Sequence, residues 1–289
     1  MNYLLHILIV ISIYSILAMS LNLLVGYTGL LALCQGAFYG IGAYTSVLLI
    51  TGLGLSYPVA VLLAIVATAI MSLAISVPSL RLKGDYFVLA SLGFQMISYS
   101  VFQNWIAVTR GSSGISGIPS PSLFGFEVNT PLAYFVFSTV VALLCALLLY
   151  VLAESPFGRV LKAIREDEIA TIALGKSTVR FKITAFAIAA GLSAVAGSLY
   201  AGYARFIDPT SFTLMESTFI LTIIIVGGAG NIAGPLLGTV LLIGLPEALR
   251  FLSMSDAVAG NVRQIIYGAL IVIMLRFRPS GLWGEYEFE

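Results

Sequence analysis

The sequence contains little charge. Only 9% of its 289 residues are Asp, Glu, Lys or Arg, against about 25% in soluble globular domains, whereas 60% are hydrophobic. Residues 1–80 contain no charged residue, and the first is Arg81. At about 1.5 Å per residue, a helix of that length would measure about 120 Å, far more than the roughly 30 Å hydrocarbon core of a bilayer. The chain therefore crosses a membrane several times before its first charge, which excludes a soluble enzyme.

Cysteine and histidine are also scarce, with two cysteines and one histidine in the whole chain. Cys34 and Cys145 both lie in apolar runs, so they form neither a disulfide framework nor a metal site, and we expect no metal. The net charge of +1 provides no basic field for nucleic acid, which excludes nucleic-acid binding as the function.

Uncharged runs separated by turn residues predict the membrane helices. The expected fold is all-α, a polytopic membrane bundle of about eight to nine transmembrane segments forming a single domain over residues 1–289. The expected helices lie near 3–25, 30–50, 57–80, 85–104, 131–152, 181–203 and 262–277, with a long apolar stretch at 217–250.

Lysine and arginine in short loops predict the orientation. Ten of these residues fall on one side if the helices alternate, in clusters at 81–83, 159–182 and 276–278, and four fall on the other side. This bias places residues 81–84, residues 153–182 and the C-terminus in the cytoplasm of a bacterial or archaeal cell.

The stretch 217–250 is predicted to break. An odd number of crossings must separate residue 216 from residue 278, and the stretch contains Gly227-Gly-Ala-Gly-Asn-Ile-Ala-Gly-Pro235, which weakens a helix. Residues 217–229 would form a half-helix of about 20 Å that ends inside the membrane, either re-entrant or followed by a second leg. Close helix packing through small residues remains the alternative. A second glycine-rich passage at 22–42 suggests an internal repeat, which the sequences do not align well enough to establish.

Residues 154–182, the charged segment, hold ten charged residues in 29 positions. Ser155 and Pro156 suit a helix start and Gly175 a stop, and an imperfect apolar stripe at 161–173 predicts one short amphipathic helix. A solvated loop, a helix lying on lipid and a docking helix for a soluble partner all fit this pattern. The acidic run at 166–168 argues against the lipid surface, where basic residues are preferred.

Two nucleotide-binding patterns occur and are both rejected. Residues 170–177 fit a relaxed phosphate loop, but a charged block precedes them where that motif needs a buried strand. Residues 228–233 fit a dinucleotide fingerprint, but no alternation of strands and helices surrounds them. The chain is therefore not predicted to be an enzyme or to bind a cofactor.

The sequence resembles the permeases of branched-chain amino acid ABC transporters, specifically the LivM-like subunit. The matching stretches include SLNLLVGYTGLLALCQGAFYGIGAY (20–44), LRLKGDYFVLASLGF (80–94), TRGSSGISGIP (109–119), SPFGRVLKAIREDEIATIALGKSTVRFKITAFAIAAGLSAVAGSLYA (155–201), GGAGNIAGPLLG (227–238) and RPSGLWG (278–284). The stretch 155–201 is the most specific, and LRLKGDYF favours a LivM-like over a LivH-like subunit.

The resemblance implies a permease subunit of an ATP-driven importer in the plasma membrane. Its expected partners are a LivH-like permease, two cytoplasmic ATPase subunits that carry ATP and Mg²⁺, and an extracytoplasmic binding protein. The segment 161–175 resembles the coupling helix that such permeases present to an ATPase, with Ala170 at the alanine of the acidic–Ala–Gly loop. The implied coupling residues are Ala163, Ile164, Arg165, Glu166, Asp167, Ala170, Leu174 and Gly175.

A moderately polar path is expected to carry the substrate. Its candidate residues are Asn22, Thr28, Gln35, Tyr44, Gly228 and Asn231, each of which could equally be satisfied by a neighbouring helix. Within the ABC class, urea, short amides and small aromatic acids remain alternative substrates. An ion-coupled secondary transporter would need ionisable residues at membrane depth, and the first six predicted spans contain none in their cores. A channel is disfavoured because no filter motif is present.

Overall fold

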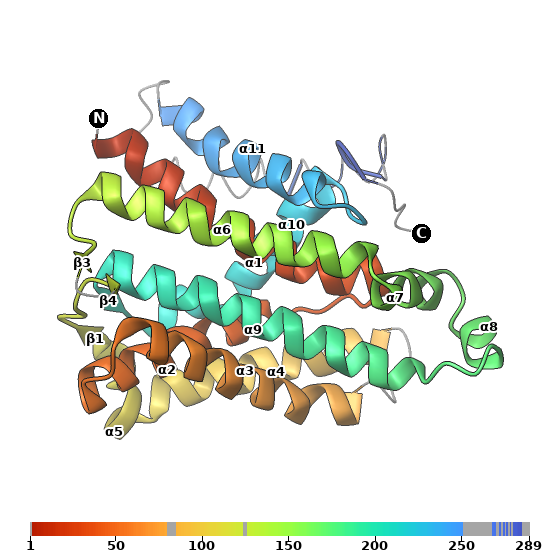
Figure 1. Ribbon diagram of the computed structural model, residues 1–289, viewed down its shortest axis with the longest axis horizontal. Helices are drawn as coiled ribbons and strands as arrows, with labels where there is room; N and C mark the ends of the chain where they lie inside the picture. Colours follow the sequence, from red (N-terminus) through yellow and green to blue (C-terminus); the bar gives the residue numbers. More distant parts are fainter. Residues whose placement is uncertain are drawn as a thin grey trace.

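Long helices lie side by side along the longest axis of the molecule (Figure 1). The computed structural model describes residues 2–79, 85–123, 126–250 and 280–284, with single residues between 268 and 278. Within these ranges, five helices are long and apolar enough to cross a membrane. They are α1 (Asn2–Thr28), α2 (Gln35–Leu53), α3 (Tyr57–Ser79), α6 (Pro131–Glu154) and α9 (Thr178–Ala204).

Shorter or more polar elements complete the described chain. The helices are α4 (Asp85–Asn104), α5 (Ile106–Thr109), α7 (Pro156–Glu166), α8 (Glu168–Ala173), α10 (Leu214–Gly227), α11 (Ala233–Arg250) and the 3₁₀ turns Gly111–Ser113 and Pro209–Phe212. Two antiparallel pairs join β1 (Ile115–Ser116) to β4 (Phe206–Ile207) and β2 (Ser122–Leu123) to β3 (Phe126–Glu127).

The molecule has two distinct ends. Helix α8 protrudes at one end, and the β1–β4 pair lies at the other, near the N-terminus (Figure 1). Arg205 ends α9 at the β1–β4 end, where its guanidinium donates to Ser120. The charged segment lies at the α8 end. Arg205 and the basic residues of the charged segment therefore lie at opposite ends of the molecule, as the loop charges predict. Arg81 and Lys83 lie outside the described residues.

The predicted helix positions are confirmed for the spans near 3–25, 57–80, 85–104, 131–152 and 181–203, with ends shifted by a few residues. The helix expected at 30–50 begins only at Gln35, because residues 29–34 are not helical. The expected helix near 262–277 lies almost entirely outside the described residues.

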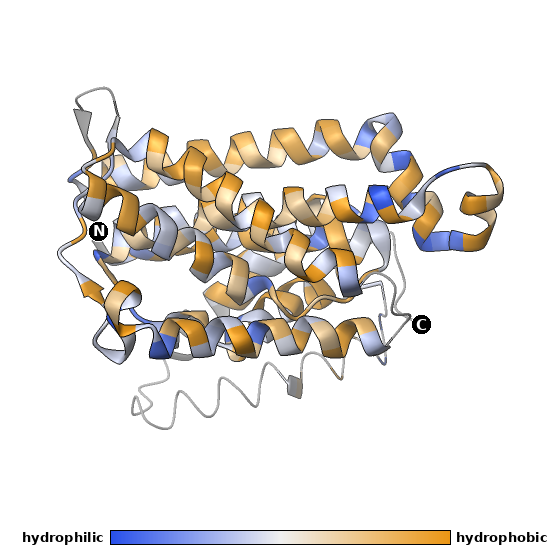
Figure 2. Ribbon diagram, turned by 90° about the horizontal axis from the view of Figure 1, so that it is seen from below, coloured by the Kyte–Doolittle hydropathy of each residue, from blue (hydrophilic) through white to orange (hydrophobic). Residues whose placement is uncertain are grey.

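Helices α1, α2 and α9 form the centre of the bundle, where small side chains allow close contact. A Cβ atom on Gly197 would lie 2.2 Å from the carbonyl oxygen of Tyr39, and one on Gly42 would lie 2.2 Å from the Cα of Ala194. The small residues of α9 therefore allow the helices to pack closely. Helices α3 and α6 expose apolar rows outward. Figure 2 shows the hydrophobic colour along most of the long helices.

Helix α2 begins inside the bundle, where its first N–H groups cannot reach water. Side chains from α4 and α10 accept them instead, together with the N–H of Leu33 just before the helix. The bonds run from the N–H of Leu33 to Ser91 (2.9 Å), of Gly36 to Ser217 (2.8 Å) and of Ala37 to Gln95 (2.7 Å). Gln95 also donates to the carbonyl oxygen of Phe212 at 2.9 Å. The break in the helical chain at 29–34 is thus tolerated because protein groups satisfy it.

Replacing Gln95 with Leu is expected to destabilise the fold. The change orphans the N–H of Ala37 and the carbonyl oxygen of Phe212, and each buried group left unpaired costs roughly 1–3 kcal/mol. Gln103→Leu is the matched control, because the side-chain oxygen of Gln103 is buried without a hydrogen-bond partner among the described residues. Thermal unfolding of the detergent-purified variants checks this. Equal midpoints for the two variants would contradict the capping role of Gln95.

Candidate functional site

The charged segment joins α6 to α9 through two short helices. The Ser155 side chain accepts the N–H of Gly158 at the start of α7, and Pro156 occupies the first turn. Gly175 follows α8 with φ +77°, a conformation that favours glycine. The start and stop predicted from the sequence are therefore confirmed.

The single amphipathic helix expected at 161–175 is wrong in one respect, because Asp167 divides it. Asp167 has an extended backbone (φ −154°), and its carboxylate accepts the N–H groups of Ile169 and Ala170 at 2.8 and 2.9 Å. A side chain that caps the next helix in this way starts a new helix instead of continuing the previous one. The apolar stripe is divided at the same place, so its two parts face different surroundings.

Helix α7 faces the membrane helices. Leu161 and Ile164 are buried, and Lys162 lies over the ring of Tyr27 at the end of α1, 5.5 Å from its centroid. The Arg165 side chain, 9% exposed, donates to the carbonyl oxygen of Gly26 at 2.6 Å. This carbonyl lies in the last turn of α1, where a cation interacts favourably with the helix dipole.

Helix α8 faces outward and is apolar on its surface. Ile169 and Leu174 are nearly four-fifths exposed and Ile172 is half exposed. Exposed apolar side chains gathered on one segment are candidates for an interaction surface. An ion pair between Lys182 and Glu168 (2.7 Å) ties α8 back to α9. We call Ile169, Ile172 and Leu174 the α8 patch.

The eight predicted coupling residues fall into two groups. The exposed ones are Ala163, Glu166, Asp167, Ala170, Leu174 and Gly175. Ile164 and Arg165 differ from these, because their side chains point into the bundle. The coupling role of all eight residues stays a prediction. The exposed Ile169 and Ile172 were not among the predicted residues, although their apolar side chains follow Asp167 within the charged segment.

The break predicted in 217–250 is confirmed at residues 228–232, here called the glycine break. Helix α10 ends at Gly227, and Gly228 has φ +104°. The N–H groups of Leu282 and Trp283 donate to the carbonyl oxygens of Val226 and Gly227 at 3.0 and 2.9 Å. A C-terminal turn at 280–284 therefore satisfies the end of α10, and α11 returns toward the β1–β4 end (Figure 1).

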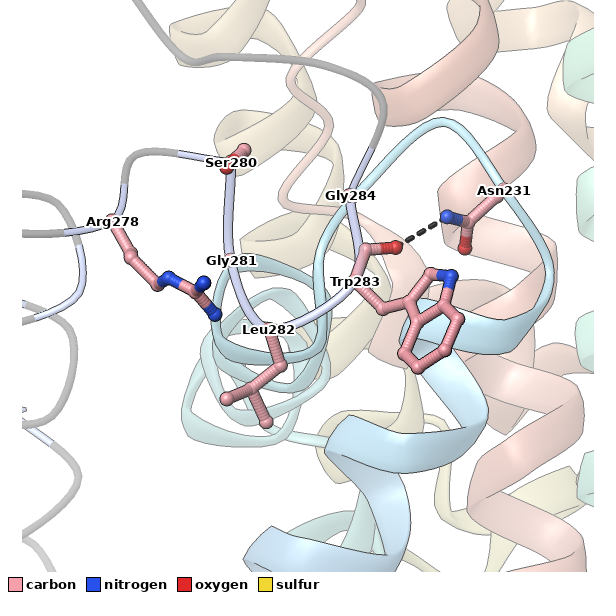
Figure 3. Close-up of a pocket in the computed structure, with 7 residues that line it drawn as sticks. All are labelled: Asn231, Arg278, Ser280, Gly281, Leu282, Trp283 and Gly284. Carbon is pink, nitrogen blue, oxygen red and sulfur yellow. Dashed lines mark hydrogen bonds between the residues drawn. The ribbon is translucent and has the colours of Figure 1, made fainter.

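Three of the predicted path residues meet at the glycine break. Asn22 of α1 donates to the carbonyl oxygen of Asn231 (2.6 Å) and accepts the N–H of Gly230 (3.1 Å). The Asn231 amide donates in turn to the carbonyl oxygen of Trp283 (Figure 3). Gly228 lies against Gly284. A pocket of about 380 Å³ lies beside them, lined by Asn231, Arg278, Ser280, Gly281, Leu282, Trp283 and Gly284.

The other three path candidates lie elsewhere. Thr28 donates to the carbonyl oxygen of Leu24 in its own helix. Gln35 donates to Ser20 (2.5 Å) and Ser193 (2.6 Å) in the core. The ring of Tyr44 stacks on Phe102, 4.9 Å between centroids. The structure therefore does not bring the six candidates to one surface, and their role in a path stays a prediction.

Known proteins are similar to this sequence over nearly its whole length. The family described as "Branched-chain amino acid transport system / permease component" matches residues 3–275. The chain belongs to this permease family. The LivM permease proteins of the high-affinity branched-chain amino acid transport systems of Salmonella typhimurium and Escherichia coli are each 38% identical to it, over 93% of this chain and 67% of the relative.

The sister permease of those systems is more distant. The LivH permease protein of Escherichia coli is 27% identical, over 96% of this chain and 93% of the relative. This order agrees with the LivM-like resemblance. No solved structure matches the permease. Family membership and the apolar helices together identify it as a multi-pass membrane protein and a transport subunit, not an enzyme.

Proposed function

We propose that the chain is the LivM-like permease subunit of an ABC importer that moves branched-chain amino acids inward across the plasma membrane. The substrate class is supported by the names of the relatives, which are branched-chain amino acid permeases. The proposed assembly pairs it with a LivH-like permease, two cytoplasmic ATPase subunits and an extracytoplasmic binding protein. The chain forms one permease domain of about eight to nine crossings with a cytoplasmic C-terminus.

The observation that carries the proposal is the α8 patch. It stands out from the bundle between two membrane helices, at the end to which the positive-inside rule assigns the cytoplasm. A soluble ATPase seated there would bury the apolar side chains and would contact the exposed Glu166 and Asp167. ATP and Mg²⁺ would then be bound by that partner, while this chain binds no cofactor.

Energy reaches the membrane by a shift between conformations. ATP binding favours one arrangement of the ATPase pair. This arrangement biases the permease only by the difference in its affinity for the two permease conformations. A partner held at α8 pulls on α6 through α7, which follows α6 directly. It pulls on α9 through the ion pair between Lys182 and Glu168. The membrane helices would alternate between outward-open and inward-open arrangements.

Reconstitution of the complete transporter in proteoliposomes tests this function. We expect uptake of Leu, Ile and Val that requires both the binding protein and ATP. Uptake of urea, short amides or small aromatic acids in their place would overturn the substrate class. Uphill uptake by the permease without any ATPase would overturn the ABC assignment and favour an ion-coupled transporter.

A further inference from the structure

A continuous set of contacts runs from the charged segment to the glycine break. It begins at Arg165, whose guanidinium donates to the carbonyl oxygen of Gly26 at 2.6 Å. This carbonyl is among the last four of α1, which have no partner within the helix. Gly29, where the helix ends, packs against the same side chain, with a Cβ position 3.3 Å from the Arg165 Cγ. Arg165 therefore holds the end of α1.

The same part of α1 also holds the glycine break. Gly26 touches the loop so closely that a Cβ atom there would lie 2.4 Å from the nitrogen of Gly230. One turn earlier, Asn22 is 1% exposed and uses both ends of its amide, donating to Asn231 and accepting from Gly230. Two residues of α1 thus connect Arg165 on one side with the loop on the other.

The loop is in turn connected to the C-terminal turn. Asn231 donates to the carbonyl oxygen of Trp283, and the N–H groups of Leu282 and Trp283 bond to the end of α10 (Figure 3). Displacing the end of α1 therefore displaces the loop, the end of α10 and the C-terminal turn together, since close-packed contacts transmit small movements.

We propose that Asn22 is a positioning residue that transmits movement of the charged segment, through Arg165 and the end of α1, to the glycine break. This inference rests on the proposed function. It assigns Asn22 to the coupling of ATP hydrolysis with transport, and not to contact with the transported solute.

The complete transporter in proteoliposomes provides the test, with ATP hydrolysis and leucine uptake measured on the same vesicles. Asn22→Leu removes both hydrogen bonds and keeps the branched shape of the side chain. We expect ATP hydrolysis to persist and leucine transported per ATP to fall about tenfold, within the range of roughly 5- to 150-fold that coupling free energies between protein sites span. Thr68→Val is the control, because Thr68 is equally buried but bonds the carbonyl oxygen of Ala64 in its own helix.

Two further variants keep the test decisive. Asn22→Ala removes the same two hydrogen bonds without adding side-chain volume, so it should lower the ratio as well; it decides the question if Asn22→Leu does not assemble. Combining Asn22→Leu with Arg165→Gln should lower the ratio no further than the stronger single variant, because both interrupt one connection. An unchanged ratio in the Asn22 variants, or additive losses in the double variant, would overturn the proposal. Failure of the unmodified complex to transport leucine would instead overturn the proposed function.

Discussion

Replacing Ile169 and Ile172 with Asp is expected to abolish ATP-driven uptake while the protein still inserts in the membrane. Both side chains are exposed on α8 and contribute nothing to the bundle core. If an ATPase covers them, each new carboxylate is desolvated without a partner, and truncation at such interface centres already costs about 2 kcal/mol or more. The expected loss is therefore at least about thirtyfold in partner affinity.

Co-purification of the ATPase and vesicle uptake measure this effect together. Ile106→Asp is the matched control, because Ile106 is as exposed as Ile169 but lies in α5, next to the β1–β4 end. The paired change Glu166→Lys and Asp167→Lys should uncouple uptake for an electrostatic reason and should also remove the Asp167 cap of α8. Normal uptake by the Ile169 and Ile172 variant would show that α8 does not seat a partner.

Replacing Gly228 with Leu is expected to reduce transport to less than about one-tenth of the original rate, since the change carries two separate penalties. Its φ of +104° strains any residue with a side chain, at a cost of about 1–3 kcal/mol, and each 1.36 kcal/mol is a factor of ten. A Cβ atom would also lie 2.3 Å from the nitrogen of Gly284, so the C-terminal turn must move away from α10.

Gly54→Leu separates these penalties. Gly54 also has a positive φ of +64°, but nothing lies within 4 Å of its Cβ position. This variant carries backbone strain without a collision, so we expect it to retain most of its uptake. If Gly228→Leu and Gly54→Leu transported equally well, contact between the C-terminal turn and the glycine break would have no role in transport.

The sequence predicted features that depend on local composition. Uncharged runs located the spans, because burial in lipid excludes charge wherever it occurs. The break near Gly228 and the helix start at Ser155 were predicted equally well, since glycine and capping residues act on their own backbone. These features need no knowledge of distant parts of the chain.

Features that depend on a distant partner could not be predicted. Nothing near Gly36 indicates that Ser217 accepts its N–H, and nothing near Gln95 indicates that it caps α2. The resemblance implied that Ile164 and Arg165 are coupling residues, but it could not show that the Arg165 side chain meets the end of α1. The division of the charged segment depended on whether Asp167 extends one helix or caps the next, and only the backbone decides this.

The interior start of α2 has a consequence for how the chain is made. The N–H groups of Leu33 and Ala37 receive their acceptors from residues synthesised 58 positions later, whereas Gly36 waits for Ser217, 181 positions later. At about 5–20 residues per second, a ribosome needs about 10–40 s to produce that serine. Helices α1 and α2 must therefore stay in contact with water, as in the insertion channel, until α10 has been translated. A nascent chain that stops before α10 leaves the N–H of Gly36 without its acceptor.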